Sequence, residues 1–340
     1  MMKASFRNDY CILAHENIFK ALLKEANKQH IAYGNDKHSD NAKKLIKKTF
    51  KCEDADIYFV SGGTQANMLV ISYLLKHYEG VISCDTGHIN VHETAAVEGN
   101  GNKVYTVKNT NGKLTSEDVR KALSINTGTH MVKLKMVYIS NSTEMGTIYT
   151  KDELLKLRQV CDENDLYLFM DGARLGSALT CKENDLTPEF ISEVCDIFYI
   201  GGTKNGTLSG EAIVFKNKEM SKDFAYHIKN KGALLAKGFV LGIQFEEMFK
   251  NNLYFKIAKH TNDMATYIKD NLKVQFYMDS PTNQIFICLN HKHASKVMKE
   301  FDCELWESYE DYDVIRIVTS FLTKLEDCKY LVEYINKLVK

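Results

Sequence analysis

Apolar and polar positions along the chain follow two alternating patterns, one typical of strands and the other of helices. Short apolar or β-branched runs predict buried strands at residues 56–60, 80–84, 103–107, 136–140, 167–170 and 197–200. Longer segments with helical periodicity lie between some of them, at residues 64–78, 116–124 and 151–164. The alternation predicts an α/β fold with a mostly parallel sheet flanked by helices.

The pattern changes near residue 238. A long helical stretch is expected up to residue 271, followed by strands at 274–278 and 284–289, a short helix at 293–301, a strand at 314–319 and a closing helix. These elements predict a smaller C-terminal α+β domain. We therefore expect a large domain over residues 1–240 and a small domain over residues 241–340.

Composition narrows the possible classes of protein. The chain has 340 residues, of which 44% are hydrophobic, and its 44 Lys and Arg balance its 44 Asp and Glu. A neutral chain has no field that favours nucleic acid or an anionic membrane, so neither is expected as a partner. No apolar run is long enough to span a bilayer and the first residues are polar, so we expect a cytoplasmic location.

The cysteines and histidines indicate neither a disulfide framework nor a metal site. The nine cysteines are scattered without a C-x-x-C pair, which favours reduced thiols. His88 and His92 are four residues apart but have no second ligand pair nearby, so no metal is expected.

Three clusters at predicted strand ends carry possible chemistry. Residues 61–67 (Ser-Gly-Gly-Thr-Gln-Ala-Asn) join a strand to a helix N-terminus, which forms either an anion site or a simple turn. Asp171 ends another strand, where a carboxylate can pair with a cationic ring nitrogen or form a structural pair with Arg174. Lys204 follows a third strand among glycines, as a nucleophilic amine or an exposed turn lysine.

The order and spacing of these clusters resemble the threonine aldolase and β-eliminating lyase family of fold-type I pyridoxal-phosphate (PLP) enzymes, in the aspartate aminotransferase-like superfamily. The similarity covers nearly the whole chain in the family's order. It rests on residues 6–9 (Phe-Arg-Asn-Asp), 33–36 (Tyr-Gly-Asn-Asp), 63–67 (Gly-Thr-Gln-Ala-Asn), 85–89 (Asp-Thr-Gly-His-Ile), 171–174 (Asp-Gly-Ala-Arg), 202–204 (Gly-Thr-Lys) and 315–319 (Ile-Arg-Ile-Val-Thr).

The resemblance implies a PLP site with assigned roles. Lys204 would carry PLP as a Schiff base, and Asp171 would bond the pyridine nitrogen. Gly63 and Thr64 would donate to the phosphate, His88 would stack on the ring face and Arg174 would bond the phenolic oxygen, with Thr203 as a further cofactor contact. Arg316 and Asn8 would bind the substrate carboxylate. The active sites of the family lie between subunits, so the resemblance also implies a homodimer or homotetramer, with Tyr33 and Lys237 as candidate contributions from the partner.

One departure from the family concerns its second active-site histidine. The corresponding place after the strand at 136–140 holds Thr143 or Glu144. His92 could replace the missing group, whereas Asn90 or Glu93 could simply order the loop.

The resemblance implies cleavage of the Cα–Cβ bond of a β-hydroxy-α-amino acid, L-threonine or L-allo-threonine, to glycine and acetaldehyde. Two alternatives remain open at this stage. One is β-elimination or transamination of a small amino acid on the same scaffold. The other is a PLP-fold protein that has lost catalysis and serves as a binding module.

Overall fold

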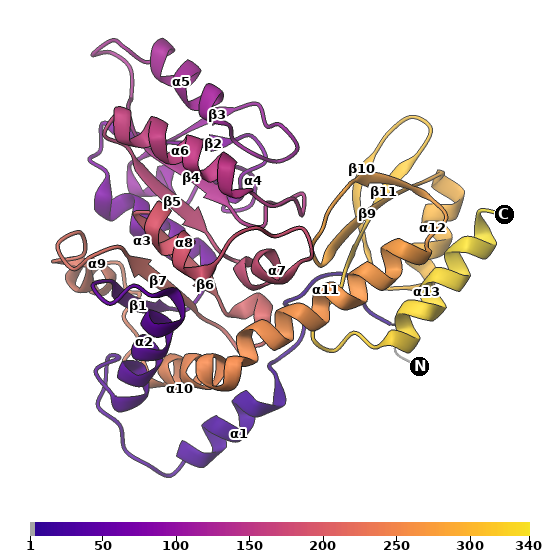
Figure 1. The fold of residues 1–340 in the computed structure, drawn as a ribbon, viewed down its shortest axis with the longest axis horizontal. Helices are drawn as coiled ribbons and strands as arrows, with labels where there is room; N and C mark the ends of the chain where they lie inside the picture. Colours follow the sequence, from indigo (N-terminus) through magenta and orange to yellow (C-terminus); the bar gives the residue numbers. More distant parts are fainter. Residues whose placement is uncertain (1–3) are drawn as a thin grey trace.

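The larger sheet of the protein is almost entirely parallel (Figure 1). The computed structural model describes residues 4–340. The sheet contains β1 (Asp56–Val60), β2 (Glu79–Cys84), β3 (Lys103–Val107), β4 (Lys133–Ser140), β5 (Tyr167–Asp171), β6 (Ile197–Gly201) and β7 (Glu211–Phe215), in the order β1-β7-β6-β5-β4-β2-β3. Strand β7 is antiparallel to both of its neighbours, and all other pairs are parallel. The predicted α/β fold is confirmed.

Both faces of this sheet are buried, because successive side chains of a strand point to opposite sides. Ile82 and Val137 belong to one core, while Val81 and Met136 belong to the other. The first core also holds residues of α1 (Glu16–Glu25), α2 (Lys37–Phe50), α5 (Ser116–Ile125), α6 (Lys151–Glu163), α8 (Pro188–Val194) and α10 (Phe239–Phe249). The second is covered by α3 (Gly63–Leu74), α4 (His88–Val91) and α9 (Phe224–Asn230).

The C-terminal part has its own antiparallel sheet, in the order β10-β11-β9-β8. Its strands are β8 (Gln275–Met278), β9 (Gln284–Leu289), β10 (Glu304–Ser308) and β11 (Asp313–Val318). Its core includes side chains of α11 (Leu253–Asn271), α12 (His291–Glu300) and α13 (Leu325–Leu338), and also Phe6 from the start of the chain. The predicted small α+β unit is therefore present, and the N-terminal segment packs against it.

The prediction of one long helix up to residue 271 was wrong. Asn251 and Asn252 have φ values of 58° and 57°, so a short 3₁₀ segment, η3 (Lys250–Asn252), separates α10 from α11. Asparagine accepts this left-handed conformation more readily than most residues, and two in succession end the helix.

The carboxyl ends of the parallel strands meet at one edge of the larger sheet. Ser140 is in register with Asp171, and the Gly201 N–H donates to the Gly172 carbonyl oxygen over 2.9 Å. The segments that follow β2, β4, β5 and β6 therefore start next to one another, beside the smaller sheet. Within residues 4–340, no helix combines the length and apolarity needed to cross a membrane.

Candidate active site

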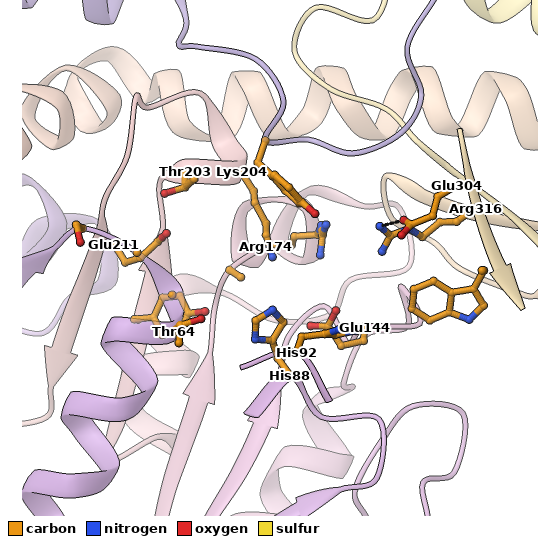
Figure 2. A pocket seen from close by; sticks show the side chains of 17 residues that line it. Thr64, His88, His92, Glu144, Arg174, Thr203, Lys204, Glu211, Glu304 and Arg316 are labelled. Carbon is orange, nitrogen blue, oxygen red and sulfur yellow. Dashed lines mark hydrogen bonds and ion pairs between the residues drawn. The ribbon is translucent and has the colours of Figure 1, made fainter. Parts of the chain in front are cut away.

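A cavity of about 450 Å³ lies between the strand ends of the larger sheet and the smaller sheet (Figure 2). Most of the residues that the sequence analysis selected line it: Gly63, Thr64, His88, Arg174, Thr203, Lys204 and Arg316. Asp171 is 3% exposed and contacts Tyr199, which also lines the cavity. The fold therefore assembles seven predicted residues from five distant segments and places Asp171 directly behind them.

The turn between β1 and α3 can receive an anion. Gly62 caps α3 without any side-chain hydrogen bond to the helix, so the first N–H groups are left without a side-chain acceptor. Gly62 has an extended backbone, with φ of −172°, and a Cβ added there would meet no atom within 4 Å. The glycine therefore leaves open space at a helix N-terminus, the arrangement that phosphate binding uses.

Lys204 lies in the short 3₁₀ segment η2 (Thr203–Asn205), directly after β6. Its side chain is half-buried, its Nζ is 5.8 Å from the centre of the Tyr10 ring, and it makes no hydrogen bond or ion pair within residues 4–340. A Cβ at Gly201 would come within 2.3 Å of the Ala173 carbonyl oxygen. That close backbone contact holds the loop of Lys204 against the loop that follows Asp171, and the amine faces the cavity rather than bulk solvent.

Asp171 is a buried, fully hydrogen-bonded carboxylate. Tyr199 donates to its Oδ1 (2.5 Å), Tyr138 to its Oδ2 (2.6 Å), and the Ala173 N–H and Asn67 Nδ2 donate over 2.9 and 3.1 Å. Burial alone would raise the pKa of Asp171, but His88 and the two tyrosine hydroxyls outweigh burial and lower it. The group is therefore ionised at neutral pH, and a cationic ring nitrogen would have to share one of its occupied acceptor positions.

His88 is oriented by a buried acid. Its Nδ1 lies 2.7 Å from Oε1 of Glu93, and Asn67 donates from Nδ2 to both Glu93 and Asp171. Burial would lower the pKa of His88, but Glu93, Glu144 and Asp171 raise it. Glu93 therefore orders the His88 side chain, while Asn90 donates to the Asp85 carbonyl oxygen at the base of the same loop.

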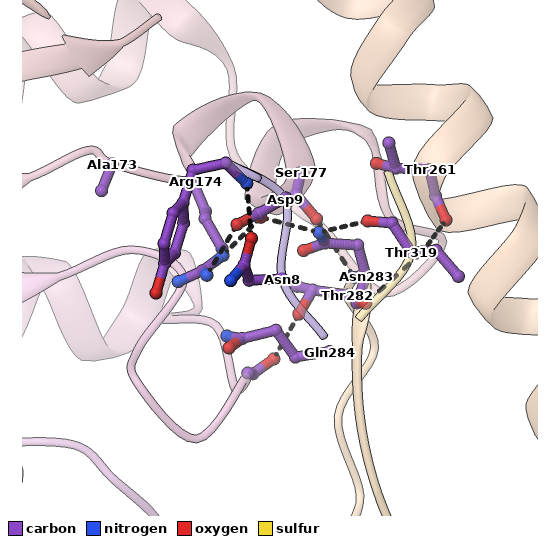
Figure 3. A network of polar contacts seen from close by, with 12 residues as sticks. Asn8, Asp9, Ala173, Arg174, Ser177, Thr261, Thr282, Asn283, Gln284 and Thr319 are labelled. Carbon is purple, nitrogen blue, oxygen red and sulfur yellow. Dashed lines mark hydrogen bonds and ion pairs between the residues drawn. The ribbon is translucent and has the colours of Figure 1, made fainter. Parts of the chain in front are cut away.

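Arg174 forms a buried ion pair with Asp9 (Figure 3). Its Nε donates to Asp9 Oδ2 over 2.7 Å and its Nη2 to Oδ1 over 2.9 Å. Burial works against the charge of Asp9, but Arg174, Lys204 and Asn283 lower the pKa of its carboxyl group. The pair fixes the N-terminal segment to the site, and only Nη1 of Arg174 is not used by Asp9.

Arg316 is shared between an acid and an aromatic ring. Its Nη2 contacts Glu304 Oε2, its guanidinium lies 5.0 Å from the centre of the Trp306 ring, and its Nε is buried without a hydrogen-bond partner. Glu304 and Trp306 also line the cavity. A carboxylate that entered the cavity could therefore accept hydrogen bonds from the buried guanidinium of Arg316, for which Glu304 would compete.

The structure separates the two candidates for the family's second histidine. Glu144 is 9% exposed and lines the cavity together with His88 and His92. Thr143 does not line it, and its hydroxyl lies 2.8 Å from that of Thr147. Of the two, Glu144 is the one positioned to act on a bound molecule.

Besides Asp171, three residues with a predicted role do not line this cavity. Asn8 uses its Oδ1 to accept the N–H groups of Tyr10 and Cys11, at 3.1 and 2.8 Å, which forms the turn before the site. Tyr33 is 45% exposed and Lys237 is exposed. Their segments pack together, since the Tyr33 N–H donates to the Ala236 carbonyl oxygen over 3.0 Å. Neither segment lines the cavity of its own chain.

Sequence reasoning missed Glu211, at the start of β7. It is 3% exposed, lines the cavity, and accepts from the Gly202 N–H over 2.8 Å. Burial raises its pKa to about 7, against hydrogen bonds from Thr203 and Gly202 and the charge of Lys204. An acid directly after a glycine, at the start of an apolar run, is the only signal that the sequence offers for it.

Comparison with known proteins gives a consistent assignment. The family model "Beta-eliminating lyase" matches residues 6–296. A low specificity L-threonine aldolase from a Pseudomonas species is 35% identical over 251 residues, which cover 72% of this chain and 71% of that protein. The one from Pseudomonas aeruginosa is 33% identical over 255 residues, 74% of this chain and 73% of that protein.

The solved structures agree. A Leishmania major threonine aldolase superposes with a TM-score of 0.97 at 41% identity, covering 99% of this chain and 100% of the other. An aspartate aminotransferase from Thermotoga maritima has a TM-score of 0.72 at 13% identity, over 99% and 92%, and shows the common fold alone. The resemblance seen in the sequence is confirmed: the chain belongs to the β-eliminating lyase family, a family of PLP-dependent lyases.

Proposed function

We propose that this protein is a PLP-dependent aldehyde-lyase that cleaves L-threonine or L-allo-threonine to glycine and acetaldehyde. One observation carries the proposal: a half-buried lysine amine, a buried ionised aspartate and an open helix N-terminus face or adjoin one cavity. The relatives from Pseudomonas and Leishmania, named as threonine aldolases, supply the substrate class.

The residues present fit PLP. Lys204 would bind it covalently, the N–H groups at Gly63 and Thr64 would bind its phosphate with Thr203 nearby, and Asp171 would pair with the ring nitrogen. His88 would lie on the ring, and Nη1 of Arg174 would reach its phenolic oxygen. When bound, PLP withdraws electrons from the Cα of an attached amino acid, which weakens the bonds of that carbon.

The residues that orient the substrate would determine which bond of Cα breaks. Arg316 would hold the substrate carboxylate through its planar guanidinium and so fix the rotation of the substrate about Cα. With the carboxylate fixed, Arg316 would set the orientation of the Cα–Cβ bond within the cavity. Asn8 lies in the turn beside Arg174, and we assign it a secondary role in holding the same carboxylate.

His92 is the proposed acceptor of the β-hydroxyl proton, and Glu144 lines the same cavity. Burial, together with the charges of His88, Arg316 and Lys204, lowers the pKa of His92 although Glu144 opposes this. A ring nitrogen of His92 is therefore unprotonated at neutral pH and can take the proton. The Glu144 carboxylate would stabilise the resulting imidazolium.

Product analysis tests this function. Purified protein loaded with PLP is incubated with L-allo-threonine, L-threonine and L-serine, and the aldehyde, glycine, pyruvate and ammonia are measured. We expect equimolar acetaldehyde and glycine from the threonines. Pyruvate or ammonia without acetaldehyde would instead show a β-eliminating enzyme, and no product with any substrate would favour a binding protein.

The first site prediction concerns Arg316. Replacing it with glutamine removes the charged fork that binds the carboxylate, so KM should rise about 10- to 100-fold with a smaller change in kcat. The Glu304→Gln variant removes the acidic competitor and should leave KM unchanged or lower. Steady-state kinetics with L-allo-threonine measure both; an unchanged KM in Arg316→Gln contradicts the assignment.

A second prediction concerns pH and Glu211. Its pKa of about 7 exceeds the ordinary value of 4.5, so the folded state keeps it protonated where the unfolded chain has lost the proton. Its contribution to stability is therefore lost as the pH rises from 4.5 through 7. Above pH 7 its charge would also oppose the cofactor phosphate. The Tm of Glu211→Gln should fall less between pH 5 and 8 than the Tm of the native protein. At pH 8 the variant should bind PLP about threefold to tenfold more tightly than the native protein, and at pH 6 the two should bind it equally.

Equal pH dependence of Tm and of PLP affinity in both proteins would show that Glu211 does not titrate in this range. Glu219→Gln, at an exposed glutamate, is the matched control.

We further propose that the chain works as a homo-oligomer, a dimer or tetramer. The support is that Tyr33 and Lys237 are exposed, lie on segments joined by the Tyr33 N–H to Ala236 carbonyl hydrogen bond, and do not line the cavity of their own chain, as expected of side chains that serve a neighbouring copy.

A further inference from the structure

A cluster of histidines and acids lies outside the active site, where α1, α2 and α10 meet. Glu25 is the last residue of α1, His30 lies in the connection that follows it, and His38 is the second residue of α2. Their side chains are 10%, 10% and 21% exposed. One ligand atom from each lies within 4.8 Å of the others.

The acid directs one oxygen at both imidazoles. Oε1 of Glu25 accepts from Lys28 Nζ over 2.8 Å. Oε2 lies 3.6 Å from His30 Nε2 and 3.4 Å from His38 Nε2. In a tetrahedral zinc site with bonds of about 2.0 to 2.2 Å, neighbouring ligand atoms are about 3.4 Å apart, so two of the three edges already have the right length.

His30 supplies the second, independent observation. Its Nε2 is buried and has no hydrogen-bond partner, although the ring is held against Phe239 with 4.8 Å between ring centres. Burying an imidazole nitrogen without a hydrogen-bond partner destabilises the folded protein unless something binds that nitrogen. The atom faces Glu25 Oε2, and a cation between the two would satisfy both.

His38 has a carboxylate next to its second ring nitrogen, as metal-binding histidines usually do. Its Nδ1 lies 2.5 Å from Oε2 of Glu246, and Asn41 Nδ2 donates to Oε1 of the same carboxylate over 3.0 Å. A carboxylate on one ring nitrogen fixes the proton there and leaves the lone pair on the other. The lone pair of Nε2 would then face Glu25 and His30.

We propose that Glu25, His30 and His38 form a site for a divalent transition cation of the Zn²⁺ class. Two imidazole nitrogens and one carboxylate oxygen suit zinc, and water completes the coordination. Glu246 is a positioning residue for His38. The bound cation would tie the end of α1 to the start of α2 and so fix the connection that carries Tyr33. The ligands are 5 and 8 residues apart in the sequence, which is not a recognised zinc spacing.

The test uses PLP-loaded protein that has been dialysed against a chelator and then against metal-free buffer. Zn²⁺ binding is measured by equilibrium dialysis with elemental analysis, at pH 7.5 because protonated histidines do not bind metal. We expect one Zn²⁺ per chain with a dissociation constant below about 10 µM. His30→Gln and Glu25→Gln should each weaken binding at least about tenfold.

Two controls separate this site from others. His130→Gln removes an exposed histidine elsewhere and should bind as the native protein does. His92→Gln tests the imidazole pair of the catalytic cavity. The proposal is overturned if the native protein binds no Zn²⁺ in this range, if both Glu25→Gln and His30→Gln bind normally, or if only His92→Gln loses the ion. Glu25→Gln keeps an acceptor for Lys28, so it remains a valid test should His30→Gln fold poorly.

Discussion

Replacing Lys204 with alanine is expected to abolish covalent PLP binding and to lower kcat by at least about 10³-fold, because the variant lacks both the amine that holds the cofactor and a proton carrier at Cα. The native protein should be yellow, and borohydride should fix PLP to the peptide that contains Lys204. In the variant, mass spectrometry should find no labelled peptide and the visible absorption should be lost or shifted.

The exposed Lys222 provides the matched control, since Lys222→Ala removes an amine without touching the cavity. It should keep its colour, its labelled peptide and its activity. A Lys204→Ala protein that still gains a borohydride-dependent label would mean that a different lysine holds PLP, and one that keeps native kcat would exclude the proposed mechanism.

The placement of Lys204 and Asp171 at the edge of the sheet was predictable from the sequence, because Asp171 ends one apolar run that is buried on two faces and Lys204 follows another. Such runs are the strongest strand signals in the chain, and parallel strands place their carboxyl ends together. The six predicted strands of the large sheet all exist, with ends shifted by a few residues at most. Strand β7 was missed, although it brings Glu211 into the site, because five residues after a glycine loop carry little periodic signal.

Pairings between distant residues were beyond the reach of the sequence. Arg174 pairs with Asp9 across 165 positions, and Asn67 links Glu93 to Asp171 by donating a hydrogen bond to each. Each of these polar groups is common in a turn or at a helix end, so its type does not reveal its partner. Which residues become partners is determined by the way the N-terminal segment and α3 pack against the sheet. The same reason hid the cluster of Glu25, His30 and His38.

The second large effect is expected at Asp171. Asparagine in its place keeps the shape but removes the negative charge that would hold a cationic ring nitrogen, so kcat should fall about 10²- to 10³-fold and PLP should bind more weakly. Burial would raise the pKa of this carboxyl, but His88, Tyr138 and Tyr199 outweigh burial and lower the pKa. Its contribution to stability is therefore present above the ordinary pKa of 3.8 and lost only as the pH falls below it. Activity between pH 6 and 9 should not be limited by its titration.

Tyr138→Phe separates the charge of Asp171 from the hydrogen bonds around it. This variant removes one donor, at 2.6 Å from Oδ2, while the carboxylate, Tyr199 and Asn67 remain. If the charge is what matters, Tyr138→Phe should retain most of its kcat and its PLP affinity, while Asp171→Asn loses both. Equal losses in the two variants would instead mean that the buried network acts by holding the strand ends in place, and urea unfolding of both proteins would then show matching decreases in stability. Because both tyrosine hydroxyls can rotate to accept from an asparagine amide, Asp171→Asn should remain folded, and its kinetic defect can be measured directly.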